Sequence, residues 1–244
     1  MKRIMMAAAA LVLAAGAALA QGFTPEQRAE IVTILREALR TDPTILREAI
    51  GALQDSERQA QETARRQALA DNADALFRDA ADPVKGNPRG DVTIVEFFDA
   101  RCGYCKSFYP AMQQLLQRDR NVRVVLKDLP ILGPNSVLAS RALLAAHRQG
   151  KYEPLFDALM RLRVEPTETV LQAEAQRAGL DWPRLRRDME DPAIQARLQG
   201  NIALAQRLQI EGTPALIIGD TIVPGAVELP ELERLVAEAR RPRG

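Results

Sequence analysis

Apolar residues recur at helical intervals in the first third of the chain. The first stripe of this kind consists of Ile31, Ile34, Leu35 and Leu39. Spacings of three and four residues predict an amphipathic helix. Thr24, Pro25 and Gln27 precede the stripe as a cap, a first helical residue and a reciprocal capping-box residue. The pattern therefore predicts a helix that begins at Pro25.

A second amphipathic helix is predicted after residues 41–43 (Thr-Asp-Pro), which interrupt the first. Its stripe consists of Leu46, Ile50 and Leu53. Beyond Asp55 the chain is polar and alanine-rich until Leu76, which predicts a long exposed helix. Short helices bury little apolar surface alone, so the stripes need either the rest of the chain or another copy as a partner. The polar stretch favours self-association.

A turn-rich boundary at residues 82–91 leads into a different pattern. Residues 92–98 are β-branched and aromatic and predict a buried strand. A helix from about Gly103 to Leu116 and a second strand at 122–126 are predicted to follow. This order predicts a parallel strand pair with a right-handed crossover.

The remaining elements complete an α/β fold. Residues 134–208 are mostly helical in pattern, and strands at 215–218 and 221–223 then flank a two-residue hairpin turn. The helical stretch is broken at Gly150, Pro166, Gly179 and Pro192. A last helix begins near Pro230. The sequence predicts a thioredoxin-like fold with a helical insertion at about 134–208, preceded by an N-terminal α-helical segment.

The opening twenty residues have the layout of a secretory signal peptide. Lys2 and Arg3 precede an apolar run at 4–15, and residues 18–20 (Ala-Leu-Ala) supply a cleavage site before Gln21. The apolar run is too short to span a bilayer comfortably as an anchor. We expect cleavage of residues 1–20 and export to the periplasm.

Composition and charge exclude several classes of partner. The chain has 33 basic and 32 acidic residues, and 47% of its 244 residues are hydrophobic. This is typical of a soluble globular protein. The near-balance of charge predicts no nucleic-acid partner and no polybasic membrane patch.

The two cysteines carry the chemistry of the chain. Cys102 and Cys105 are separated by only two residues, so a disulfide between them would restrain the unfolded chain very little. A reactive dithiol explains the spacing better. The helix start, with Arg101 and Lys106 nearby, predicts a lowered pKa for Cys102. Cys102 is therefore expected to attack substrate disulfides, and Cys105, one turn further, to resolve the mixed disulfide.

Two other interpretations of the cysteines stay open. They can be buried free thiols at a chance spacing of three, or ligands of a metal. Zinc normally needs four ligands, whereas the chain has no second C-x-x-C and a single histidine, His147, to which we assign no role. Copper(I) can bind two thiolates. We expect no metal.

Two motifs together resemble a known family. Residues 95–99 (Val-Glu-Phe-Phe-Asp) lead into the C-x-x-C, and residues 211–214 (Glu-Gly-Thr-Pro) follow far downstream. Both closely resemble the DsbA family of bacterial thioredoxin-like proteins, over about residues 83–241. The resemblance implies that Pro214 is cis and faces the dithiol. It also implies that Thr213 pairs with a bound peptide, beside Gly103 and Tyr104.

The same resemblance assigns an acid below the dithiol. Glu96 occupies the family position of a buried carboxyl group that exchanges a proton with Cys105. Burial would raise the pKa of such a group. An ordinary glutamate at a sheet edge is the alternative. Asp99 is interpreted as a loop carboxylate with a capping role.

The chain departs from DsbA in two ways. Gly103 and Tyr104 replace the Pro-His of DsbA, and a neutral tyrosine stabilises the thiolate less, which predicts a milder oxidant. Residues 21–82 have no counterpart in DsbA and resemble the arrangement of ScsC-type and Com1-type proteins, whose N-terminal helical segments assemble several catalytic domains. The predicted organisation is a signal peptide at 1–20, an oligomerisation segment at 21–82 and a catalytic domain at 83–244.

These observations predict a periplasmic disulfide isomerase or reductase that acts on misfolded exported proteins. The Cys102–Cys105 pair is its only redox centre, without a bound cofactor. A membrane reductase of the DsbD type is implied as the partner that keeps Cys102 reduced. The alternatives are a monomeric DsbA-like oxidase with a DsbB-type partner, and a copper(I)-handling or chaperone binding protein.

Overall fold

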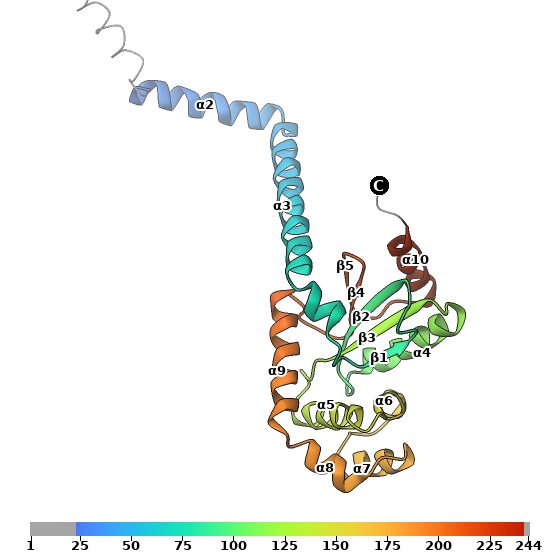
Figure 1. Cartoon of the computed structure of the whole chain (residues 1–244). Helices are drawn as coiled ribbons and strands as arrows, with labels where there is room; N and C mark the ends of the chain where they lie inside the picture. Colours follow the sequence, from blue (N-terminus) through green and yellow to red (C-terminus); the bar gives the residue numbers. More distant parts are fainter. Residues whose placement is uncertain (1–22, 242–244) are drawn as a thin grey trace, which may run out of the picture. The chain divides into compact units, whose positions relative to one another are not determined.

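The computed structural model describes residues 23–241 (Figure 1). The predicted signal peptide therefore lies outside the described residues. Two compact units divide the chain, Met1–Glu62 and Thr63–Gly244. Within residues 23–241, no helix combines the length and the apolar character that crossing a bilayer requires.

The N-terminal helices begin as predicted. In helix α2 (Pro25–Thr41) the Thr24 backbone N–H donates to Gln27 Oε1 over 2.9 Å, and the Gln27 N–H donates to Thr24 Oγ1 over 3.3 Å. Asp42 Oδ1 then accepts from the Thr44 N–H at the start of helix α3 (Thr44–Asp71). The predicted second helix and polar helix are wrong as separate elements. They form the single helix α3, because no proline or glycine lies between Gly51 and the end of the helix.

Both predicted apolar stripes are exposed to solvent except for the half-buried Leu39. No residue of α2 is buried. The exposed large apolar side chains of these helices are Ile31, Val32, Ile34, Leu35, Ile45, Leu46, Ile50 and Leu53. The polar part of α3 is exposed as far as Gln67, as predicted.

A five-stranded mixed sheet forms the centre of the second unit, in the order β1-β3-β2-β4-β5. The strands are β1 (Val84–Gly86), β2 (Val92–Phe98), β3 (Val122–Asp128), β4 (Ala215–Ile218) and β5 (Thr221–Pro224). β2 and β3 are parallel, as predicted, and the other neighbouring pairs are antiparallel. Gly219 makes the hairpin turn with a φ of 64°, which favours glycine. The sequence pattern missed β1, which is only three residues long.

Alternating side chains of the sheet pack into two cores. On one face, Ile94 and Phe98 of β2 pack with helices α4 (Gly103–Arg118), α5 (Pro134–His147), α6 (Tyr152–Arg161) and α10 (Leu229–Arg240). On the other face, Val95 and Phe97 pack with Leu69, Leu76 and the end of helix α9 (Pro192–Arg207). Because side chains alternate along a strand, Glu96 lies on the same face as Ile94, toward α4.

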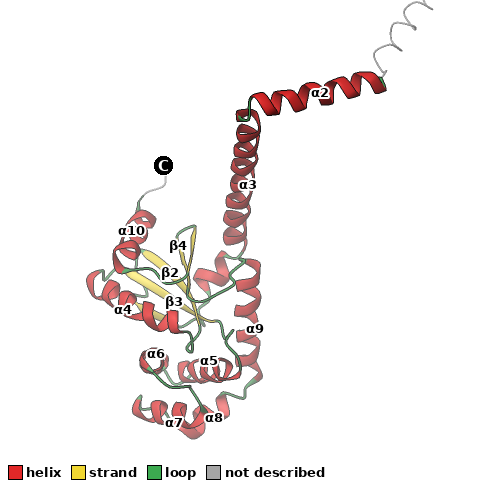
Figure 2. Ribbon diagram, turned by 180° about the vertical axis from the view of Figure 1, so that it is seen from behind, coloured by secondary structure: helices red, strands yellow, loops and turns green. Residues whose placement is uncertain are grey.

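The helical insertion is observed where it was predicted. Helices α5, α6, α7 (Glu168–Arg177) and α8 (Trp182–Asp188) gather into one cluster beside the sheet, and α9 returns the chain from this cluster to β4 (Figure 2). A short π-helical turn, η1 (Asp74–Arg78), precedes β1 and buries Leu76. The fold is the predicted thioredoxin-like sheet with a helical insertion and an N-terminal helical segment.

Candidate active site

The dithiol lies where β2 leads into α4. Cys102 is the N-cap residue of α4, and Cys105 lies in its first turn. The two side chains differ in access to solvent: Cys102 is 6% exposed and Cys105 is fully buried, while Tyr104 between them is 73% exposed. Substrate can therefore approach Cys102 but not Cys105, which is the asymmetry that the spacing predicted.

The surroundings of Cys102 favour its thiolate. Its pKa is lowered to about 5, mainly because the Cys105 thiol donates a hydrogen bond to the Cys102 sulfur. Partial burial opposes this shift, whereas the Thr213 side chain and backbone N–H groups of the first turn of α4 add to it. In the thiol form, Cys102 Sγ donates to the Thr213 carbonyl oxygen over 3.2 Å. At neutral pH the thiolate form of Cys102 is therefore favoured.

Cys105 retains its proton. The hydrogen bond to Cys102 raises its pKa most, and burial and the negative charge of Glu96 raise it further. A thiol in this position reacts only after a base removes its proton or after Cys102 is consumed in a mixed disulfide. The two cysteines are therefore differentiated by their environments.

The predicted helix start contributes to this activation through backbone N–H groups, and the two predicted cations are held by other partners. Arg101 pairs with Glu165 over 2.5 and 2.8 Å and also donates to the Leu132 carbonyl. Lys106 Nζ donates to the Leu162 carbonyl over 2.9 Å. Both cations are engaged by the insertion, and the dominant contributions to the Cys102 pKa come from hydrogen bonds.

The pKa of Cys102 predicts the pH dependence of alkylation. Because the thiolate is the reactive form, the alkylation rate of the reduced protein should stay constant from about pH 8 to pH 6 and then fall. We expect a midpoint near pH 5. Iodoacetamide kinetics, together with thiolate absorbance in the ultraviolet, measure it. In Cys105→Ala the midpoint should rise, since the largest stabilising hydrogen bond is lost. A midpoint near that of free cysteine in the unmodified protein would contradict this assignment.

Asp99 has a larger structural role than the predicted helix cap. Its side chain is fully buried. One carboxylate oxygen accepts from the Arg101 N–H over 2.8 Å, and the other accepts from the Ile131 and Leu132 N–H groups over 2.9 and 3.1 Å. Asp99 therefore ties the loop before Cys102 to the loop after β3.

Replacement of Asp99 by alanine is expected to destabilise the fold. The change leaves three N–H groups without their acceptor, and we expect the free energy of unfolding to fall by about 3 kcal/mol. Denaturant unfolding of the reduced protein measures it. Asp91→Ala is a matched control, because Asp91 is half-exposed and forms an ion pair with the surface residue Arg240. We expect a loss below about 1 kcal/mol there. Equal losses in the two variants would refute the role of Asp99.

Glu96 is buried below the dithiol. Its side chain is 3% exposed on the face of the sheet that packs against α4. Burial raises its pKa to about 8. The alternative of an ordinary edge glutamate is therefore wrong, since β2 is an inner strand with β3 and β4 on either side.

The downstream motif lies beside Cys102, as the resemblance implied. The Thr213–Pro214 peptide bond is cis. Pro214 is buried and Thr213 is partly exposed. The Gly103 backbone is open, with no neighbouring heavy atom within 4 Å of the position that a Cβ would take. Gly103 and Tyr104 follow Cys102 directly in α4, and the Thr213 carbonyl lies 3.2 Å from its sulfur. Their contact with a substrate stays a prediction.

Sequence reasoning missed three exposed apolar residues next to the site. Ile131 and Leu132 are 44% and 43% exposed, and Val164 is 58% exposed. Asp99 and Arg101 connect the first two to the dithiol loop, and the Arg101–Glu165 pair places Val164 nearby. The apolar residues 129–132, which directly follow β3, could have indicated Ile131 and Leu132 from the sequence.

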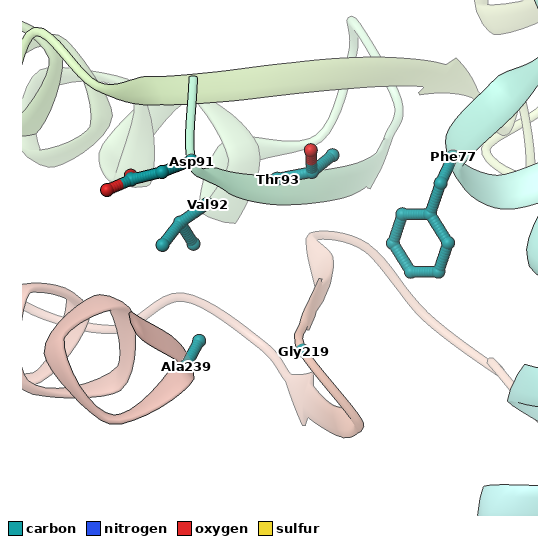
Figure 3. Close-up of a pocket in the computed structure, with 6 residues that line it drawn as sticks. All are labelled: Phe77, Asp91, Val92, Thr93, Gly219 and Ala239. Carbon is teal, nitrogen blue, oxygen red and sulfur yellow. The ribbon is translucent and has the colours of Figure 1, made fainter. Parts of the chain in front are cut away.

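One hollow of the second unit lies away from the dithiol. It is a pocket at the start of β2, the end remote from Cys102 (Figure 3), with a volume of about 250 Å³. Its lining consists of Phe77, Asp91, Val92, Thr93, Gly219 and Ala239. None of the predicted site residues lines it.

Comparisons with known proteins agree with this geometry. The DSBA-like thioredoxin domain matches residues 93–237, and the Copper resistance protein ScsC N-terminal domain matches residues 27–60. A thioredoxin-like oxidoreductase from Silicibacter pomeroyi is 46% identical, with a TM-score of 0.68, over 70% of this chain and 98% of that one. ScsC of Proteus mirabilis, in a transitional conformation, is 32% identical, with a TM-score of 0.67, over 90% of this chain and 97% of that one.

Curated relatives extend well beyond this chain. A Na⁺/H⁺ antiporter of Salinispora tropica is 31% identical over 160 residues, which are 65% of this chain and 24% of the antiporter. The chain thus spans about a quarter of the length of the curated relatives that it matches. The family match, the ScsC N-terminal domain and the differentiated dithiol lead to one conclusion: the chain belongs to the DsbA-like thioredoxin family and is a thiol-disulfide oxidoreductase of the DsbA/ScsC type.

Proposed function

We propose that the protein acts in the periplasm as an isomerase or reductase of disulfides in exported proteins. The thiolate of Cys102 supports this proposal. Its pKa of about 5 lies between the values of about 7 in thioredoxin and about 3.5 in the strongly oxidising DsbA. An intermediate pKa suits isomerisation, because the thiolate is fully formed at neutral pH and is still a good leaving group.

The observation that favours an isomerase over a monomeric oxidase is the exposed apolar surface of α2 and α3. Their eight large exposed apolar side chains form helical stripes, and the exposure of this much apolar surface to water is unfavourable. We propose that residues 21–82 associate with the same segment of other copies. Several Cys102 sites then face a shared space, where one substrate can meet more than one dithiol.

Misfolded exported proteins are the substrates that the dithiol surface fits best. Tyr104, Leu132 and Val164 supply exposed apolar contacts beside Cys102. The Thr213 carbonyl can accept a substrate N–H once Cys102 is joined to the substrate sulfur. The dithiol carries the electrons itself and needs no other cofactor. Repeated isomerisation requires a reduced Cys102, so we propose a DsbD-type membrane reductase as the redox partner.

Reactivation of scrambled ribonuclease in a mildly reducing buffer tests the proposal. The unmodified mature protein should restore ribonuclease activity, and Cys102→Ala should not. Failure to restore activity, together with fast oxidation of a dithiol peptide, would establish the monomeric oxidase with a DsbB-type partner instead. Stoichiometric copper(I) binding without any exchange would identify a copper-handling protein.

A further inference from the structure

Lys85 is a buried lysine that lies outside the dithiol site. It lies on the edge strand β1, and its side chain is 5% exposed. Its register partner is Val124 of β3, which packs in the core together with α4. Directly paired residues of neighbouring strands face the same side of a sheet, so Lys85 lies on the dithiol face, as Glu96 does.

Two carboxylates of α6 hold the Lys85 ammonium in place. Its Nζ lies 2.5 Å from Glu153 Oε1 and 2.8 Å from Asp157 Oδ1. The Glu153 side chain is 55% exposed and that of Asp157 is 21% exposed. A buried ammonium is stable only when opposite charges and hydrogen bonds satisfy it. The pair of carboxylates therefore holds the Lys85 ammonium in place beneath the insertion.

The other charged and titratable groups around Lys85 and Glu96 come from α4, α6 and β3, which provides the buried Asp128 that accepts from the Tyr152 hydroxyl over 2.8 Å. Asp157 lies 3.8 Å from Arg161, whose guanidinium also donates to the Tyr109 hydroxyl over 3.1 Å. Tyr109 follows Cys105 by one turn of α4. Glu96 itself interacts electrostatically with Cys105 and with Tyr152 at the start of α6. Burial raises the pKa of Glu96, and the Lys85 ammonium is the charge that opposes this shift.

We propose that Lys85, anchored by Glu153 and Asp157, is a positioning residue that sets how readily Glu96 takes the proton of Cys105. The inference rests on the proposed oxidoreductase cycle and deepens it. Glu96 and Cys105 carry out the step, and Lys85 acts on it through Glu96. β1, which carries Lys85, and α6, which carries its two carboxylate partners, thereby influence the loss of the proton from Cys105 on α4.

The step concerned resolves the mixed disulfide. The Cys105 thiol gives its proton to the Glu96 carboxylate, and the resulting thiolate attacks the Cys102 sulfur. The Cys102–Cys105 bond forms as the bond between Cys102 and the substrate sulfur breaks. The substrate sulfur leaves as a thiolate and takes a proton from water. The dithiol loses two electrons and the substrate disulfide gains them. The Lys85 charge favours the carboxylate form of Glu96, which is the form that accepts the proton.

The first test measures Glu96 directly in the oxidised protein, where no thiol titrates. We expect Lys85→Met to raise the midpoint of the Glu96 carboxyl ¹³C titration by about one pH unit, since a nearby opposite charge is lost. At pH 7 the fraction of carboxylate then falls about tenfold. Single-turnover reaction of the reduced protein with oxidised glutathione should show the resolution phase slowed by the same factor, with the phase of Cys102 attack unchanged.

Matched variants separate the charge from the packing. Lys85→Arg keeps the charge and should restore the midpoint. Lys127→Met removes another buried lysine, 3% exposed and 2.6 Å from Asp82, but Lys127 pairs with Phe97 in register and so faces the other side of the sheet. Its Glu96 titration should match that of the unmodified protein. If Lys85→Met does not fold, Lys85→Gln carries the same expectation.

An unshifted Glu96 midpoint in a folded Lys85→Met protein would overturn the proposal. In a Glu96→Gln background, Lys85→Met should slow resolution no further, and additional slowing would show that Lys85 acts by another route. If Glu96→Gln alone leaves resolution unchanged, the role of Glu96 in the cycle fails, whatever the titration shows. If the unmodified protein shows no phase of Cys102 attack, the oxidoreductase cycle itself is refuted.

Discussion

Replacement of Cys102 by serine is expected to reduce thiol-disulfide exchange to the uncatalysed background, whereas Cys105→Ala should preserve attack and accumulate mixed disulfides. The reason lies in the separation of roles between the two sulfurs. Cys102 is accessible and has a lowered pKa, whereas Cys105 is fully buried and has a raised one. A serine hydroxyl is not ionised at neutral pH and cannot replace the thiolate.

Non-reducing electrophoresis with mass spectrometry measures both outcomes on a disulfide-containing substrate. Cys105→Ala should appear covalently joined to substrate through Cys102, and added thiol should release it. Cys102→Ser should form no adduct. Asp91→Ala is a suitable control, because Asp91 is half-exposed, precedes β2 at the end remote from Cys102, and its replacement changes neither sulfur. Adducts formed through Cys105 in the Cys102→Ser protein would reverse the assignment of roles.

Much of this site could be predicted from sequence because its elements are local. β2 is a continuous run of β-branched and aromatic residues, and the C-x-x-C follows it within a few positions. Strand, loop and helix start therefore place Cys102 at a helix N-terminus without any long-range information. The same locality explains why the capping box of α2 was predicted down to single residues.

The features that sequence reasoning missed depend on contacts between distant segments. β1 is a strand only because β3 pairs with it, and its three residues carry no alternation that could be recognised. The buried Asp99 is satisfied by the N–H groups of Ile131 and Leu132, more than thirty residues away. Arg101 was expected to add positive charge near Cys102, and its ion pair with Glu165 of the insertion was missed.

Glu96 shows how the two kinds of information combine. Its place in the motif implied burial, but the charges that act on it come from elsewhere in the chain. Lys85 lies on a different strand, and the carboxylates that hold Lys85 lie on α6. Hydrophobic patterning records none of these relations, because a lysine in a turn-rich segment is normally interpreted as exposed.

The second large effect is expected in the N-terminal helices. Ile34→Gln combined with Leu35→Gln should convert an assembly of several chains into monomers. These side chains are 61% and 54% exposed, and association would bury them. Their loss removes roughly 4 kcal/mol of apolar burial per copy, which corresponds to about a thousandfold in an association constant. Glutamine preserves helix propensity, so α2 itself should remain.

In the Ile34→Gln, Leu35→Gln protein, the mass measured by sedimentation and the reactivation of scrambled ribonuclease should both change. The mass should fall to that of one chain and isomerase activity should disappear, while reduction of insulin by the Cys102–Cys105 dithiol continues. Glu30→Gln combined with Arg36→Gln is the matched control, with two exposed polar positions of the same helix changed and the net charge kept. It should remain assembled and active. If the unmodified protein is already monomeric, the exposed stripes have another partner, and the monomeric oxidase becomes the better account of the dithiol.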